Sequence, residues 1–172
     1  MAIILGVDPG SCVTGFGVIE TTAKSCRYLA SGCIRVKAKV EAERLSQIFT
    51  DLSQIITEFS PTTAAIEQVF MFFNASSALK LGQARGAALV AMAHYGLDVA
   101  SYSAKQVKQA VVGYGGAEKS QVQHMVMALL GLNKKPASDA ADALAIALCH
   151  YHTTESLKHF PGAKKTVSGR LR

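Results

Sequence analysis

The order of hydrophobic periodicities along the chain is the feature that most constrains its fold. Three strand-like segments come first, and helical periodicity then alternates with two further strand-like runs. The expected strands are residues 3–7, 15–20, 27–36, 63–69 and 99–102, and the expected helices are residues 41–59, 76–95, 104–112, 118–130 and 138–151. Strands joined by hairpin turns pair antiparallel, whereas strands joined through helices pair parallel. We therefore predict an α/β protein with a five-stranded mixed sheet flanked by helices.

The first expected strand ends at a carboxylate. Asp8 follows a β-branched run and is followed at once by Pro9 and Gly10, which end the strand. Open α/β sheets place their ligand sites at the carboxyl ends of such strands. On its own, Asp8 is better explained as a turn residue that bonds its own backbone. The remaining acidic residues decide between a turn and a site.

Two pairs of glycines indicate surfaces that another group approaches closely. Gly15 and Gly17 share one face of the second expected strand, which favours contact with another backbone, a ligand or a crossing helix. Gly82 and Gly86 lie four residues apart in the expected helix 76–95. Each glycine costs about 1 kcal/mol in a helix interior, so tight packing or a partner surface is expected to compensate.

Three further acids occupy positions that are otherwise apolar. Glu67 lies in a run suited to a buried strand, where an unpaired carboxylate would be costly. Asp139 and Asp142 are three residues apart near the start of the final expected helix and therefore share a face. The helix dipole explains Asp139 in the first turn. It explains Asp142 poorly, because nearly all neighbours of Asp142 in the helix are apolar.

The convergence of these acids would require a cation. Two like charges about 4 Å apart repel by about 4 kcal/mol at an effective dielectric constant of 20. Hydrolysis of phosphodiesters by two metal ions uses such carboxylate clusters, and their hard oxygen ligands suit Mg²⁺. The chain has only 12 acidic residues, and four of them fall at these positions. We hypothesise a metal site formed by Asp8, Glu67, Asp139 and Asp142.

Composition points to a polyanionic partner. The chain has 18 Lys and Arg residues against 12 acids, a formal net charge of +6, and a pI near 9.2. Its four cysteines form no CxxC pair and show no zinc-ligand spacing. No signal-peptide or membrane-spanning pattern is visible. We expect a cytoplasmic protein with free thiols and no membrane partner.

Six stretches together resemble one family. They are residues 4–11, 65–70, 78–86, 106–109, 117–122 and 138–145, and in order they cover nearly the whole chain up to residue 150. The sequence resembles the RuvC family of bacterial Holliday-junction endonucleases, in the RNase H-like (retroviral integrase) superfamily. The chain departs from the family pattern at Cys12, where many relatives have arginine, and in the more aromatic pair Phe72 and Phe73.

This resemblance implies a function and a division of the chain. It implies an RNase H-like nuclease domain over residues 1–152 and a homodimer that cuts two opposed strands of a four-way DNA junction, leaving 3′-hydroxyl and 5′-phosphate ends. Two Mg²⁺ ions per active site are implied, with Mn²⁺ as a possible substitute. The family's metal ligands match Asp8, Glu67, Asp139 and Asp142. The RuvA–RuvB branch-migration complex is implied as a partner during recombination and repair.

The resemblance also assigns contacts to DNA. Phe70 matches a phenylalanine that stacks on a junction base, whereas Phe72 and Phe73 are expected in the core. Lys108 and Lys119 match basic residues near the scissile phosphate, and Lys119 is counted with the catalytic residues. Lys119 also lies near a helix N-terminus, which favours anions. The remaining candidates for backbone contacts are Lys80, Arg85 and Lys105.

The last twenty residues are basic, and three alternative functions stay open. Residues 153–172 carry five basic residues and one acid without apolar periodicity, which predicts a mobile basic tail. A ribonuclease H would share the acid cluster, and an actin-like or sugar-kinase ATPase would share the phosphate-binding hairpin. A catalytically silent junction-binding protein is the third alternative, which the complete acid set disfavours.

Overall fold

The computed structural model describes residues 1–23, 25–69, 75–158, 166–167 and 170–171. Helices and strands follow one another as β1 (Ala2–Asp8), β2 (Val13–Thr21), β3 (Cys26–Arg35), α1 (Glu41–Phe59), β4 (Thr63–Glu67), α2 (Ala75–His94), β5 (Asp98–Tyr102), α3 (Ala104–Val112), α4 (Lys119–Leu130), α5 (Ser138–Lys158), β6 (Thr166–Val167) and β7 (Arg170–Leu171). The five strands and five helices predicted from periodicity are all present. Among the described residues, no helix is both long and apolar enough to span a membrane.

The main sheet has the strand order β3-β2-β1-β4-β5. The first three strands pair antiparallel, as expected for strands joined by short turns. β4 and β5 are reached through helices, and they extend the sheet parallel to β1. The predicted mixed sheet is therefore confirmed, and β1 lies at its centre.

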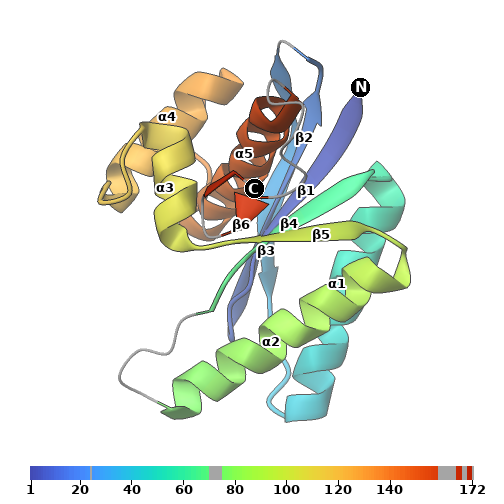
Figure 1. Cartoon of the computed structure of the whole chain (residues 1–172). Coiled ribbons are helices and arrows are strands. Elements are labelled where there is room, and N and C mark those ends of the chain that lie inside the picture. The colour runs from blue at the N-terminus through green and yellow to red at the C-terminus, as the bar shows by residue number, and fades with distance from the viewer. Residues whose placement is uncertain (24, 70–74, 159–165, 168–169, 172) are drawn as a thin grey trace.

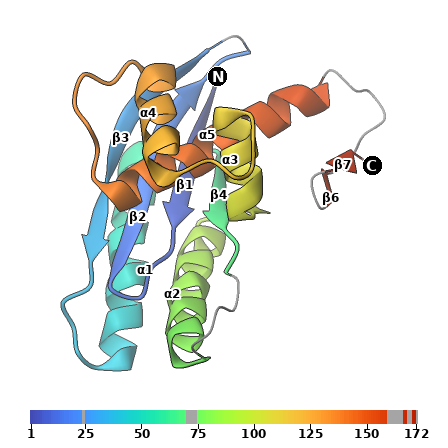
Figure 2. The same cartoon turned by 90° about the vertical axis from the view of Figure 1, so that its left-hand side faces the viewer.

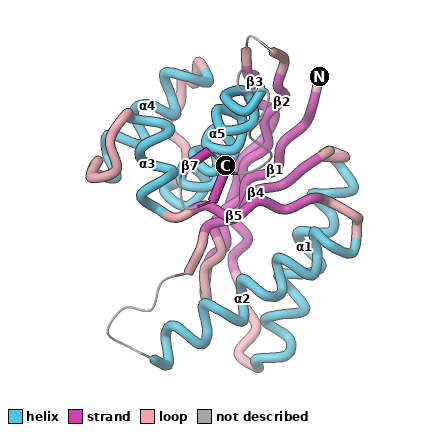
Figure 3. The backbone as a smooth tube through the Cα atoms, viewed as in Figure 1, coloured by secondary structure: helices cyan, strands magenta, loops and turns pink. Residues whose placement is uncertain are grey.

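Helices cover both faces of this sheet. α1 and α2 pack on one face, while α3, α4 and α5 pack on the other, so the domain has three layers (Figures 1 and 3). Side chains of β1 alternate between the two faces of the sheet. Leu5 and Val7 face α1 and α2, and Ile4 faces α5. Two hydrophobic cores result, one on each face of the sheet.

α1 has the bounds predicted from its sequence. Its stripe at three- and four-residue spacing buries Ile48, Leu52 and Ile56 against the sheet. Ser60 ends the helix in the left-handed conformation, with a φ of 46°, and Pro61 prevents its continuation. A complete local set of signals therefore fixes both the face and the end of this helix.

α5 lies unusually close to β1 and β2, because three glycines leave room for its backbone. A Cβ atom on Gly15 would overlap the carbonyl oxygen of Asp139, and one on Gly6 would overlap that of Ala143. A Cβ on Gly17 would lie 2.7 Å from the backbone nitrogen of Leu144. Of the groups expected to approach Gly15 and Gly17, the one found there is the crossing helix. This close approach brings the start of α5 to the end of β1.

The end of α5 differs from the prediction. The helix continues to Lys158, seven residues beyond the expected end at residue 151, so residues 153–158 are helical rather than part of a mobile tail. The hydroxyl groups of Thr154 and Ser156 donate to carbonyl oxygens of the preceding turn, and Lys158 pairs with Glu155. Local polar contacts therefore extend a helix that apolar periodicity did not indicate. Beyond it, β6 and β7 form a separate two-stranded sheet (Figure 2).

Candidate metal centre and active site

Three of the four predicted acids form one cluster. Each of Asp8, Asp139 and Asp142 offers a ligand atom, and these atoms all lie within 4.8 Å of one another. Asp8 is the last residue of β1, and the two other acids lie in the first two turns of α5. Gly15, which pairs with Asp8 in the sheet, abuts the backbone of Asp139. The glycine contact thus sets the distance between the strand carboxylate and the helix carboxylates.

Glu67 joins the cluster from the neighbouring strand. β1 and β4 run parallel with Val7 opposite Ile66, so Asp8 and Glu67 lie side by side at the carboxyl ends of the two strands. Their carboxyl groups share a hydrogen bond. The structure therefore brings together all four acids that were singled out from the sequence.

The pKa of Asp8 is raised by its burial and by the neighbouring carboxylates. Burial raises it most, and the negative charges of Glu67, Asp142 and Asp139 raise it further, to about 8 from a usual value of 3.8. Burial also raises the pKa of Glu67, although the hydrogen bond to Asp8 and the charges of Lys119 and Lys108 oppose that increase. A bound cation would favour the ionised forms of both groups. The site is thus built from hard oxygen donors that need a positive charge among them.

Two lysines lie beside the acids. Lys108 of α3 and Lys119 of α4 line a pocket of about 190 Å³ together with Glu67 and Asp142. The ammonium nitrogen of Lys119 lies 2.5 Å from an Asp142 carboxylate oxygen. Partial burial lowers the pKa of Lys119, but this hydrogen bond and the nearby carboxylates raise it more, so the net shift is upward. Both lysines therefore lie at the acid cluster, as expected.

Arg85 is hydrogen-bonded within the protein. Its Nε donates to the backbone carbonyl of Glu67 at 3.0 Å, and its Nη2 donates to the Ser101 hydroxyl at 2.9 Å. The guanidinium group therefore connects α2 to the ends of β4 and β5. Since it supports the backbone of a cluster residue, its contacts are those of a positioning group.

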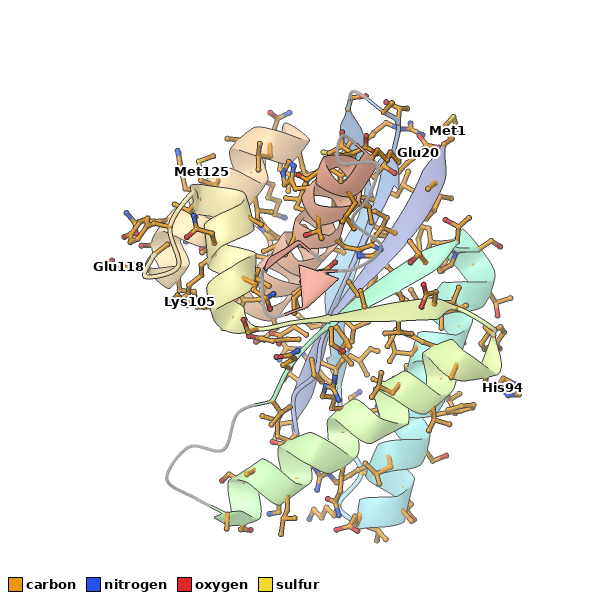
Figure 4. The ribbon with its side chains drawn as sticks, in the orientation of Figure 1. Met1, Glu20, His94, Lys105, Glu118 and Met125 are labelled. Carbon is orange, nitrogen blue, oxygen red and sulfur yellow. The ribbon has the colours of Figure 1, made fainter. Side chains whose placement is uncertain are left out.

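The other predicted DNA contacts lie outside the cluster. Lys80 is exposed on α2. Lys105 is exposed at the outer edge of α3 (Figure 4), where its side chain packs against Gly115 of the α3–α4 loop. Phe70, together with Phe72 and Phe73, lies outside the described residues, so its stacking role stays a prediction.

Two supporting residues, Arg44 and Gly6, were not predicted from the sequence. The Nη2 of Arg44, in α1, donates to the carbonyl of Ser11 at 2.7 Å and so ties the turn after Asp8 to the helix. Its position on the polar side of an amphipathic helix gave no sign of this contact. Gly6 was overlooked too, although a lone glycine inside a buried strand is a recognised signal of close backbone approach.

Comparison with known proteins agrees with this geometry. The family described as "Crossover junction endodeoxyribonuclease RuvC" matches residues 4–150. Relatives of that name are 61% identical in Pseudoalteromonas atlantica, over all of both chains, and 62% identical in Marinobacter nauticus, over 100% of this chain and 99% of the relative. The relative in Francisella tularensis subsp. novicida is 57% identical over 99% of both chains.

Solved structures show the same fold. Thermus thermophilus RuvC in complex with a Holliday junction substrate superposes with a TM-score of 0.84 at 36% identity, covering 91% of this chain and 96% of that one. The yeast mitochondrial Holliday junction resolvase has a TM-score of 0.64 at 15% identity, covering 91% and 82%, a likeness of fold alone. The expected RNase H-like architecture is confirmed. The chain belongs to the RuvC family of crossover junction endodeoxyribonucleases.

Proposed function

We propose that this endonuclease resolves four-way DNA junctions by Mg²⁺-dependent hydrolysis, with Asp8, Glu67, Asp139 and Asp142 as metal ligands. The observation that carries the proposal is the convergence of four carboxylates where α5 crosses β1. The raised pKa of Asp8 supports a site that works with cations bound. Products with 3′-hydroxyl and 5′-phosphate ends, two metal ions per site and substitution by Mn²⁺ follow from the family resemblance.

The residues of the cluster divide the work between holding metal and binding phosphate. Asp8 and Glu67 lie on rigid strands, and Asp139 and Asp142 lie on a buried helix, so the four ligands are preorganised. Bound divalent ions would supply Lewis acidity, which favours ionisation of the attacking water and stabilises negative charge on the phosphate. Lys108 and Lys119 line the adjoining pocket, where we assign them to the oxygens of the scissile phosphate. Lys119 would then stabilise charge that increases in the transition state.

The acting species in this proposal is a homodimer. One chain carries one acid cluster, whereas symmetric cuts in two opposed strands require two clusters held in a fixed relation. The exposed face of α2 supports this assembly. Among the described residues, no atom lies within 4 Å of a Cβ built on Gly82 or Gly86. Leu79 and Val90, on the same helical face, are 69% and 60% exposed. Tight packing within the chain does not compensate these glycines, which leaves the partner surface.

Other elements of the proposal follow the family resemblance. We assign residues 1–152 to the nuclease domain and the basic residues beyond it to contacts with DNA, although α5 itself extends past that boundary. Stacking of Phe70 on a junction base, association with the RuvA–RuvB complex and a cytoplasmic location stay predictions.

A substrate comparison tests the function. The purified protein is incubated with an immobile four-way junction, a duplex of the same sequence and an RNA–DNA hybrid, in Mg²⁺ or in EDTA. We expect paired nicks at symmetric positions of the junction in Mg²⁺ and none in EDTA. A DNA ligase should reseal the nicks, since they carry 3′-hydroxyl and 5′-phosphate ends.

Two outcomes of this comparison would refute the proposal. Faster cleavage of the RNA–DNA hybrid than of the junction would indicate a ribonuclease H. Hydrolysis of ATP without cleavage of any of the three substrates would indicate a phosphate-binding ATPase domain. An immobile junction prevents branch migration, so the positions of the two nicks report the geometry of the dimer directly.

A further inference from the structure

A second hollow lies next to the acid cluster, apart from the pocket that holds Lys108 and Lys119. It has a volume of about 630 Å³ and separates β3 from the segment 132–137, which joins α4 to α5. Ser31 and Arg35 of β3 line one side, and Asn133, Lys134 and Lys135 line the other. We call this hollow the β3 groove. The mechanism above makes no use of it.

The charged residues that line the β3 groove are all basic. Arg35, Lys134 and Lys135 are exposed, and no acidic residue is among its lining residues. Within the described part of the chain, none of the three forms an ion pair. Hydroxyl and amide groups of Tyr28, Ser31 and Asn133 lie among them. Cations mixed with hydroxyl and amide donors are the groups that bind nucleic-acid phosphates.

The groove adjoins the metal centre. Cys33, which lines it, pairs with Gly15, and Gly15 in turn abuts the backbone of Asp139. Ala140, the next residue along α5, also lines the groove. The pocket of Lys108 and Lys119 contains Glu67 and Asp142. The acid cluster thus borders two hollows that each carry basic side chains.

The basic segment of the groove is anchored at both ends. Leu132 donates its backbone N–H to the carbonyl of Met127, behind the left-handed Gly131 that ends α4. The side chain of Gln123 donates to the carbonyl of Pro136 at 3.0 Å, and the first turn of α5 begins directly beyond it. Lys134 and Lys135 therefore extend from a segment held on two helices, and the groove exists before DNA binds.

We propose that the β3 groove binds the phosphate backbone of the junction arm that continues from the cleaved strand on the β3 side of the metal centre. The inference rests on the proposed function. A scissile phosphate at the acids belongs to a continuous strand, so the backbone must leave the cluster in two directions. Lys108 and Lys119 neutralise it in one direction. In the other direction, the basic side chains beside the cluster are Arg35, Lys134 and Lys135 of the β3 groove, and their charges attract the phosphates that follow.

The dependence of binding on salt tests this groove. Junction affinity is measured in EDTA, where the substrate stays intact, across a series of salt concentrations. Each phosphate that a basic residue neutralises contributes about −0.9 to the log–log slope. Lys134→Gln/Lys135→Gln should therefore flatten the slope by about 1.8, and Arg35→Gln should flatten it by about 0.9. Lys134→Arg/Lys135→Arg should keep the original slope.

Arg27 is the matched control, because it lies on the same strand at the opposite end of the sheet. It pairs with Glu20 and is 71% exposed, and Arg27→Gln removes the same charge as Arg35→Gln. We expect its slope to equal that of the unmodified protein. Equal flattening by Arg27→Gln and Arg35→Gln would reduce the effect to net charge and overturn the groove.

Junction cleavage and DNA binding by the β3 groove are tested by separate measurements. If the unmodified protein does not cut junctions in Mg²⁺, the proposed function fails. If it cuts them and the Lys134→Gln/Lys135→Gln slope is unchanged, only the groove assignment fails. All substituted side chains are exposed, so each variant should melt within a few degrees of the unmodified protein, which a thermal scan checks.

Discussion

α5 and α2 are helices of nearly equal length on opposite faces of the sheet, and both are rich in small residues. α5 has eleven buried residues in its 21, whereas α2 has four in its 20. Glycines allow the close contact of α5, but they lie in the strands beneath it, at Gly6, Gly15 and Gly17. In α2 the glycines belong to the helix itself, and no described residue outside the helix contacts them.

The glycines under α5 are covered within the chain, whereas the described residues leave those of α2 uncovered. The α5 backbone packs directly on Gly6, Gly15 and Gly17. This close contact brings the four acids together. The glycine stripe of α2 costs helix stability and buries nothing in this chain. α5 therefore positions the acid cluster, and α2 carries the exposed face that we propose for the dimer.

The largest effect is expected from a side chain added between α5 and the strands beneath it. Gly15→Ala would place a methyl group on the carbonyl oxygen of Asp139, which is backbone and cannot rotate away. Overpacking of this kind costs about 1–3 kcal/mol or more, and the displaced helix would carry Asp139 and Asp142 away from Asp8. We expect lower stability in urea denaturation and no cleavage in single-turnover assays. A Gly15→Ala protein with unchanged stability and cleavage would show that the contact does not set the site.

A smaller effect is expected where α2 supports the cluster from the opposite layer. Arg85→Gln removes donors to the Glu67 carbonyl and to Ser101. Loss of such charged hydrogen bonds should slow single-turnover cleavage by about tenfold to a hundredfold. Lys80→Gln, five residues earlier on the exposed side of the helix, should instead flatten the salt dependence of junction binding by about 0.9. If the two variants had the same phenotype, Arg85 would be a DNA contact and not a positioning residue.

The glycines of α2 should respond in the opposite sense to Gly15. A methyl group at Gly82 or Gly86 meets no atom within 4 Å, so alanine should stabilise the helix by about 1 kcal/mol at each position. The same methyl groups should hinder contact between two copies of the chain. We expect a higher urea midpoint for the separated chains together with a weaker dimer in sedimentation equilibrium. A dimer of unchanged affinity would exclude this face of α2 from the interface.

A further effect is confined to protein without metal. Because the pKa of Asp8 is raised in the folded state, the folded chain keeps a proton that the unfolded chain loses near pH 4. Stability in EDTA should therefore fall as the pH rises from about 4 to about 8. Mg²⁺, which favours the ionised site, should raise the melting temperature more at pH 8 than at pH 5. Each kcal/mol of stability that is lost should lower the melting temperature by about 2–4 °C.

A matched pair of variants assigns that pH dependence. Asp8→Asn should remove much of the decrease, while Asp51→Asn in α1, on the opposite face, should leave the decrease as it is in the unmodified protein. A melting temperature that rises steadily from pH 5 to pH 8 in EDTA would contradict the repulsion among the acids.

The parts of the molecule that sequence predicted well are those with complete local signals. α1 was predicted to the residue, because its apolar stripe and the Ser60-Pro61 pair directly after it are local signals. The four acids were predicted because they are few and lie in apolar runs. The end of α5 was missed, since polar contacts and not periodicity extend it to Lys158. Arg85 was expected on DNA, and only the packing of α2 against the sheet directs its guanidinium to Glu67.

The most direct test of the central claim is the single-turnover cleavage rate of Asp142→Asn on a four-way junction in Mg²⁺. Asp142 has apolar neighbours on both sides in α5 and pairs with Lys119 at 2.5 Å. Asparagine has nearly the same shape as aspartate, so the substitution removes one charged ligand with little other change. We predict a rate lower by about 10²–10³-fold or more, with junction affinity retained or raised because one charge that repels phosphate is gone. Cleavage at the unmodified rate would contradict the four-acid metal site.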